Sequence, residues 1–153
     1  MYRHFVMYFC LIAMLCFSSQ AHSIENRWPK NIAIKKVKNA YQLILGREAD
    51  STGLDIYSNK LVEGDITVRE MVLILGTSKE FSKKFINKRT PNETIVLLYK
   101  KFLARNPESS SVINAKSSRM WEIGWKKIIK ELIDSKEYIG KFGGNTVPRL
   151  RKK

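Results

Sequence analysis

Apolar side chains recur three or four positions apart along most of the chain, which is the spacing of amphipathic helices. A first helix is predicted from Asn31 to Gly46, and a second, capped by Asp50 and Ser51, is predicted to end at Gly64. The apolar face of the first consists of Ile34, Val37, Tyr41, Ile44 and Leu45. No segment alternates apolar and polar residues for long enough to indicate a strand.

Two later helices are predicted to begin with a capping box, formed by a threonine and a glutamate three residues later. In this motif the threonine hydroxyl accepts a hydrogen bond from the glutamate amide, and the glutamate carboxylate accepts one from the threonine amide. The first box is Thr67 with Glu70, and the second is Thr90 with Glu93. Pro91 strengthens the second, because proline favours the first position of a helix. We therefore expect helices to begin at residues 67–68 and 90–91.

Two shorter helices are predicted after Ser78 and Ser135, each capped by its serine and each carrying two aromatic residues. Another helix is predicted over residues 125–133, after a glycine. Residues 109–118 are polar, and we expect them to be weakly helical at best. The expected fold class is all-α, a compact bundle of about six to eight short helices built from two related helical halves.

The sequence repeats itself at a spacing of 57–58 residues. The corresponding pairs are Tyr41 and Tyr99, Leu45 and Leu103, Arg47 and Arg105, Ser78 and Ser135, Glu80 and Glu137, Phe81 and Tyr138, and Phe85 and Phe142. The middle of each half is variable. The six aromatic residues of the pattern are expected in the core, because large aromatic side chains contribute most of the burial in a small domain. The alternative is coincidence among residues that are common in helices.

The first 23 residues have the layout of a secretory signal peptide. Arg3 precedes an apolar run over residues 5–17, and small residues follow at Ala21 and Ser23. The run is shorter than the roughly 18–20 residues that span a bilayer. We therefore expect cleavage, export to the periplasm or the medium, and no stable membrane span afterwards; an uncleaved anchor is the alternative. The expected organisation is a signal at 1–23, a lead-in and helix start at 24–36, a helical domain at 37–145 and a basic tail at 146–153.

Removal of the signal changes the chemistry that the chain can support. The chain has 28 Lys and Arg against 14 Asp and Glu, a net charge of +14, and only two cysteines and two histidines. These four residues are His4, Cys10, Cys16 and His22. The remaining chain therefore lacks a disulfide, a thiol nucleophile and a histidine base or ligand, unless cleavage after Ala21 retains His22. We predict no catalytic residue, no cofactor and no metal site.

Several motifs of the helical domain point to one family. Gly-Asp-Ile-Thr-Val-Arg-Glu-Met-Val at 64–72 precedes Ser-Lys-Glu-Phe-Ser-Lys-Lys-Phe at 78–85. Ser-Lys-Glu-Tyr at 135–138, Phe-Gly at 142–143 and Val-Pro-x-x-Arg at 147–151 close the domain. Together these motifs resemble the phycobilisome linker domain, across about residues 37–151. Residues 45–53 are also similar to a helical module of unknown function found in bacterial secreted proteins.

The linker resemblance implies a non-enzymatic scaffold without a cofactor, which sits inside ring-shaped phycobiliprotein hexamers and joins them into a light-harvesting complex at the thylakoid. A basic helical surface suits an acidic ring interior, because opposite potentials steer association. On this interpretation, arginines face partner carboxylates and two tryptophans anchor the interface. These residues are Arg69, Arg105, Arg149, Arg151, Trp121 and Trp125. A solvated basic face is the alternative for the arginines.

Three other functions remain open. The chain could be an exported helical binding module with an unknown partner in a non-photosynthetic bacterium. It could be a small secreted hydrolase, for which Glu48 with Asp50 and Glu63 with Asp65 are the available carboxylate pairs. It could bind nucleic acid non-specifically, although its lysines are spread in small groups and no nucleic-acid motif is present.

Overall fold

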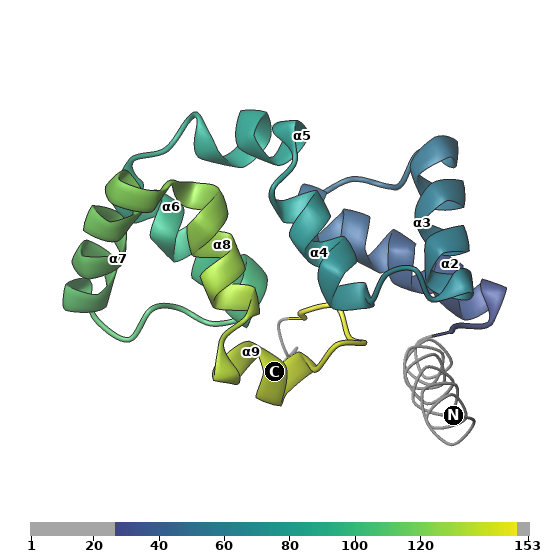
Figure 1. Cartoon of the computed structure of the whole chain (residues 1–153). Helices are drawn as coiled ribbons and strands as arrows, with labels where there is room; N and C mark the ends of the chain where they lie inside the picture. The colour runs from purple at the N-terminus through teal and green to yellow at the C-terminus, as the bar shows by residue number, and fades with distance from the viewer. Residues whose placement is uncertain (1–26, 150–153) are drawn as a thin grey trace, which may run out of the picture.

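The computed structural model describes residues 27–149, and this part of the chain is all-α (Figure 1). It contains eight α-helices, three segments of π-helix and no strand, so the predicted fold class is confirmed. The predicted signal peptide and the end of the basic tail lie outside the described residues. Within the described residues, none of the helices combines the length and the apolar character needed to cross a membrane.

The two halves of the chain form similar series of helical segments, although the π-helical segment η2 after α5 has no counterpart after α9 within the described residues. The first half has α2 (Lys30–Ala40), which continues as η1 (Tyr41–Leu45), then α3 (Ser51–Glu63), α4 (Val68–Gly76), and α5 (Lys79–Phe81), which continues as η2 (Ser82–Ile86). The second has α6 (Pro91–Leu98), which continues as η3 (Tyr99–Leu103), then α7 (Ser110–Ile123), α8 (Trp125–Ile133) and α9 (Lys136–Phe142). In Figure 1, α2, α3 and α4 group on one side and α6, α7 and α8 on the other.

Both predicted capping boxes are present. The Thr67 hydroxyl accepts a hydrogen bond from the Glu70 amide at 3.1 Å, and the Glu70 carboxylate accepts one from the Thr67 amide at 2.7 Å. Thr90 and Glu93 form the same arrangement, with Pro91 at the start of the helix. These contacts satisfy backbone amides that have no partner within the helix.

The repeat seen in the sequence is also a structural repeat. η1 ends at Gly46, with φ 65°, and η3 ends at Ala104, with φ 54°. Both are left-handed conformations, which glycine adopts freely and alanine does not. Ser78 and Ser135 cap the last helical segment of their halves, each accepting a hydrogen bond from the amide three residues on at 3.1 Å.

The expectation that residues 109–118 are weakly helical at best is wrong. They fall largely within α7, a helix of 14 residues. The Ser109 hydroxyl accepts a hydrogen bond from the Val112 amide and so caps this helix. α7 packs against α6 and α8, and four of its apolar residues lie against the core, namely Val112, Ile113, Met120 and Ile123. Tertiary packing therefore stabilises a helix that its polar composition does not reveal.

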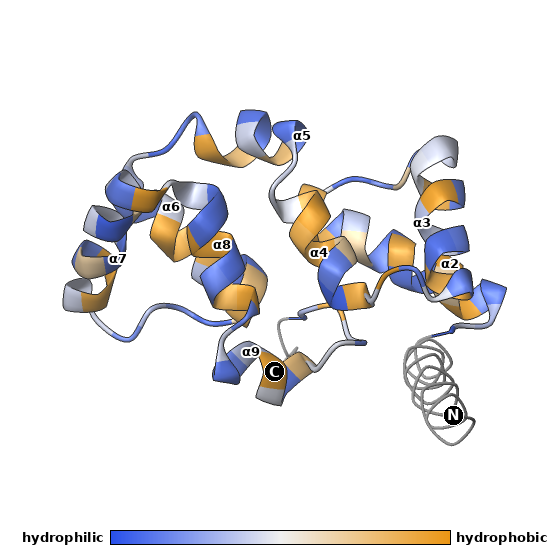
Figure 2. Cartoon of the chain, in the orientation of Figure 1, coloured by the Kyte–Doolittle hydropathy of each residue, from blue (hydrophilic) through white to orange (hydrophobic). Residues whose placement is uncertain are grey.

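The core lies where α4, η1, η3 and α8 meet. Much of α4 is hydrophobic (Figure 2), and it approaches η3 so closely that a Cβ atom at Gly76 would lie 2.6 Å from Cζ of Phe102. Four of the six aromatic residues expected in the core are buried, namely Tyr41, Phe81, Tyr99 and Tyr138. The other two, Phe85 and Phe142, are partly buried and pack against it.

The segment after α9 returns to the first half of the chain. The Gly144 carbonyl accepts a hydrogen bond from the Arg69 amide at 3.0 Å, and the Asn145 carbonyl accepts one from Lys36 Nζ at 2.6 Å. Val147 is buried. This segment therefore ties the two halves together.

Candidate partner-binding surface

In the first half of the chain, an arginine after η1 binds a glutamate on α5. Arg47 follows η1 and reaches Glu80 on α5, donating hydrogen bonds from Nε to Oε1 at 2.6 Å and from Nη2 to Oε2 at 2.8 Å. It also donates to Asp50 at 3.1 Å, and its guanidinium lies 5.1 Å from the centre of the Tyr41 ring. The paired hydrogen bonds from Arg47 lower the pKa of Glu80. We call this pair the first latch.

The second latch has the same geometry. Arg105 follows η3 and donates from Nε and Nη2 to the two carboxylate oxygens of Glu137 on α9, each at 2.6 Å. It also contacts Glu108 at 2.5 Å, and its guanidinium lies 5.1 Å from the centre of the Tyr99 ring. The hydrogen bonds from Arg105 lower the pKa of Glu137 to about 2. Each latch connects the loop that follows a π-helical segment (η1 or η3) to the last α-helix of the same half (α5 or α9).

Two lysines cover the carboxyl end of η1. Lys101 Nζ, from η3, donates hydrogen bonds to the carbonyl oxygens of Leu43 and Ile44, both at 2.9 Å. Lys84 Nζ, from η2, donates to the Leu45 carbonyl at 2.7 Å. Cations are favoured there because the last carbonyl groups of a helix carry partial negative charge. Burial lowers the pKa of Lys101 to about 8.

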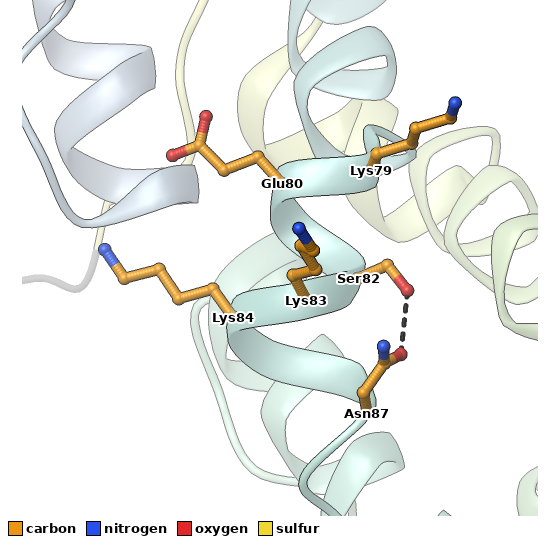
Figure 3. Close-up of a pocket in the computed structure, with 6 residues that line it drawn as sticks. All are labelled: Lys79, Glu80, Ser82, Lys83, Lys84 and Asn87. Atoms are coloured by element: carbon orange, nitrogen blue, oxygen red, sulfur yellow. Dashed lines mark hydrogen bonds between the residues drawn. The ribbon is translucent and has the colours of Figure 1, made fainter.

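Five exposed cations gather on α5, η2 and the turn that follows. We call this surface the α5–η2 basic face, formed by Lys79, Lys83, Lys84, Lys88 and Arg89. It includes a shallow hollow of about 670 Å³, shown in Figure 3. The three lysines drawn there point in different directions rather than toward one point. This arrangement suits a broad acidic surface better than a single bound anion.

The positive charge of this face is not neutralised by neighbouring acids. Glu80, the acidic residue within residues 79–89, is already held by Arg47. None of the five cations forms an ion pair within residues 27–149. By contrast, Glu131 on α8 binds two cations of α7, and Asp134, directly after α8, binds Lys130 and Arg69 of α4. Five cations without an ion pair therefore lie close together in the sequence on the α5–η2 basic face, although other exposed lysines, such as Lys126 and Lys127, also form none within the described residues.

The sequence matches the phycobilisome linker polypeptide family over residues 28–151, most of the chain. The chain belongs to this family. It is similar to the phycobiliprotein ApcE of Synechococcus sp., at 30% identity over 116 residues, and to that of Galdieria sulphuraria, at 32% over 119 residues. Each match covers 75% of this chain, but only 16% and 14% of the relative. The chain thus spans about one sixth or less of the length of these curated relatives.

The phycobilisome linker family is structural and non-enzymatic, and membership in it confirms that this chain is not an enzyme. The carboxylates considered for a hydrolase agree with this. Asp50 caps α3 by accepting the Gly53 amide at 2.8 Å, and that hydrogen bond lowers its pKa, the opposite of what a general acid needs. Within the described residues, no three His, Cys, Asp or Glu side chains are grouped as a metal site would require.

Three of the predicted partner-binding residues of this linker domain are engaged within the fold. Arg105 forms the second latch, and the side chain of Arg69 lies 3.5 Å from that of Asp134, the residue directly after α8. Trp125 is partly buried and stacks on Phe81, with ring centres 6.2 Å apart. A direct role of these residues in partner binding stays a prediction. Their observed contacts hold the domain together.

The remaining predicted contacts lie on different parts of the surface. Trp121, on α7, is 79% exposed. Arg149 is exposed at the end of the described chain and borders a hollow with α9, while Arg151 lies outside the described residues. The structure therefore does not gather the six predicted residues into one patch. Their assignment to a partner also stays a prediction.

Sequence reasoning missed the α5–η2 basic face and the buried amine of Lys101. The group at Lys83, Lys84 and Lys88 is visible in the sequence, but so are other groups of lysines. What the sequence does not show is that none of these three lysines forms an ion pair among residues 27–149. For Lys101 the sequence carries no signal, because lysines are rarely buried.

Proposed function

We propose that this linker-family domain is a scaffold that binds an acidic protein partner through the α5–η2 basic face, and that the partner is a phycobiliprotein hexamer. The observation that carries the proposal is the concentration of five cations without ion pairs on one face of a linker-family domain. Opposite charge on the partner would accelerate encounter and fix the orientation of binding.

The fold supports this surface mechanically. α5 is held by the first latch, and Lys84 is fixed to the end of η1 through the Leu45 carbonyl. Arg89 likewise donates to the Phe85 carbonyl at 2.7 Å. Two of the five cationic side chains are thus held by hydrogen bonds to the backbone. A surface that is ordered before binding loses less conformational entropy on association.

Retention of the full chain on immobilised phycobiliprotein hexamers tests the proposal. We expect binding at physiological salt that weakens steeply as salt rises, because exposed charges are screened. Immobilised serum albumin, an acidic protein of unrelated structure, and duplex DNA are the matched controls. No retention on hexamers at physiological salt, or equal retention on albumin and DNA, would refute the proposed partner, although the chain would still belong to the linker family.

An exported binding module is the second candidate, favoured by the apolar run at residues 5–17. In this case the basic face would meet an acidic protein outside the cytoplasm. Cell fractionation with N-terminal sequencing separates the two candidates. A chain that starts near residue 24 in the exported fraction supports the second, whereas an intact N-terminus in the thylakoid fraction supports the first.

A further inference from the structure

A hollow lined by uncharged side chains lies between the start of α6 and the second half of α7. It measures about 530 Å³. We call it the α6–α7 cup; its lining includes Thr90, Asn92, Asn114, Ser117, Ser118 and Trp121. Lys88 and Arg89 precede it in the sequence but do not line it. In a chain with 28 Lys and Arg, such a neutral polar hollow is distinct from the basic face described above.

Trp121 gives the cup an aromatic wall. At 79% exposed it is the most exposed large hydrophobic side chain of the described residues. It stands on α7, which lies at the outer edge of the second half in Figure 1. Core packing does not explain its position. An exposed indole ring offers a flat apolar face and one N–H donor to a ligand.

The polar groups of the cup keep unused hydrogen-bonding capacity. Asn92 Nδ2 donates to Asn114 Oδ1 across a long distance of 3.3 Å, which leaves the Asn92 carbonyl and the Asn114 amide group available. Ser117 is 6% exposed, and its Oγ is buried without a hydrogen-bond partner among the described residues. Such a buried hydroxyl is costly unless a partner satisfies it.

A second hollow adjoins the cup on the other side of the asparagine pair. It measures about 330 Å³ and is lined by Asn92 and Asn114 together with Glu93, Val96, Ser110 and Ile113. Asn92 and Asn114 therefore line both hollows, which places the two hollows next to each other. This arrangement fits a linear ligand whose successive units occupy one hollow each.

We propose that the α6–α7 cup and its neighbour bind a neutral oligosaccharide. The apolar C–H face of a sugar ring stacks on an exposed indole, and adjacent hydroxyl groups pair with the donor and acceptor of an amide side chain. The cup presents no cation and no carboxylate, and Glu93, the charged residue that lines the neighbouring hollow, has its carboxylate bound by the amide and hydroxyl of Thr90. The cup residues on α7 also belong to the variable middle of the second half, and α3, the corresponding helix of the first half, has no tryptophan.

Titration of the full chain with neutral hexasaccharides of β-1,4-linked glucose, mannose and N-acetylglucosamine tests this site. Calorimetry and amide chemical shifts are the measurements, since they do not depend on the tryptophan that is changed. We expect at least one sugar to bind at millimolar concentration or below, with shifts confined to α6 and α7. Trp121→Ala and Asn114→Ala should each weaken binding by about tenfold or more, because each removes one of the principal contacts.

Ile56→Ala is the matched control, because Ile56 is an exposed apolar residue on α3, away from the cup residues in the sequence. It should leave the affinity unchanged. Absence of binding by all three sugars overturns the proposal. So does binding that survives both Trp121→Ala and Asn114→Ala, or binding of dextran sulfate alone, which would assign the interaction to the cations.

Discussion

Arg47 and Arg105 stand 58 positions apart and hold a glutamate with the same two nitrogen atoms, Nε and Nη2. Each also contacts an acidic residue three positions on and lies 5.1 Å from the ring of a tyrosine. The two halves of the domain are therefore closed by equivalent interactions. A bidentate contact requires the planar guanidinium, which lysine cannot replace.

We expect Arg105→Lys to lower the free energy of unfolding by about 1 kcal/mol, since the charge remains but the paired hydrogen bonds are lost. Arg47→Lys should cost less, because the first latch is the more exposed of the two, with side chains 36% and 38% accessible against 28% and 30%. Denaturant unfolding measures both. Equal stability of Arg105→Lys and the natural chain would show that the second latch contributes nothing beyond charge.

Lys101 should give the protein a characteristic pH dependence. Its pKa is about 8 in the folded chain against an ordinary value of 10.5, so between these values the unfolded chain binds more protons. The contribution of this group to stability therefore rises as the pH increases from about 8 to 10.5. Because the side chain keeps part of its contact with solvent, we expect a rise of about 1–2 kcal/mol.

The difference in stability between the natural chain and Lys101→Met isolates this rise. Tyrosines whose pKa is raised by burial titrate in the same range with the opposite effect, but they are common to both proteins. Lys100→Met, which removes the exposed lysine next to it, is the control and should show no such change. A difference that stays constant from pH 7.5 to 10.5 would contradict the burial of the Lys101 amine.

Ala104 adopts a left-handed conformation that glycine occupies in the first half. We expect Ala104→Gly to stabilise the domain by about 0.5–1 kcal/mol, because relief of backbone strain exceeds the added flexibility of the unfolded chain. Gly46→Ala, at the equivalent position, should destabilise it by about 1–2 kcal/mol. Thermal unfolding tests the pair, and a lower melting temperature for Ala104→Gly would refute the argument.

Gly76 permits the close approach of α4 and η3. An added methyl group would lie 2.6 Å from the buried Phe102 ring, so Gly76→Ala should cost about 2–3 kcal/mol of stability. Phe102→Leu should restore part of that loss. Gly140→Ala, in α9, is the control, because a methyl group there meets nothing within 4 Å. It should be neutral or stabilise by up to about 1 kcal/mol.

The sequence predicts features that depend on residues close together in the chain. The capping boxes at Thr67 and Thr90 are recognisable because their partners lie three positions on. The repeat also shows that Arg47 and Arg105 are equivalent. It does not show what they bind, because Glu80 and Glu137 lie 33 and 32 positions away.

Features that depend on tertiary packing are not recognisable in this way. α7 has few apolar residues, and its helix is stabilised by contacts with α6 and α8. The basic face is another example, since the lysine groups look alike in the sequence. The positions of the acidic residues in space, such as Glu131 and Asp134, show which cations are already paired.

The most direct test of the central claim compares two triple variants in their affinity for phycobiliprotein hexamers. Lys79→Glu, Lys83→Glu and Lys88→Glu reverse the α5–η2 basic face, while Lys35→Glu, Lys38→Glu and Lys60→Glu reverse three exposed lysines on α2 and α3 with the same change of net charge. We predict that the first triple weakens binding by about tenfold or more and that the second changes it much less. Equal loss of affinity in both, or unchanged affinity in the first, would contradict the assignment of partner binding to the α5–η2 basic face.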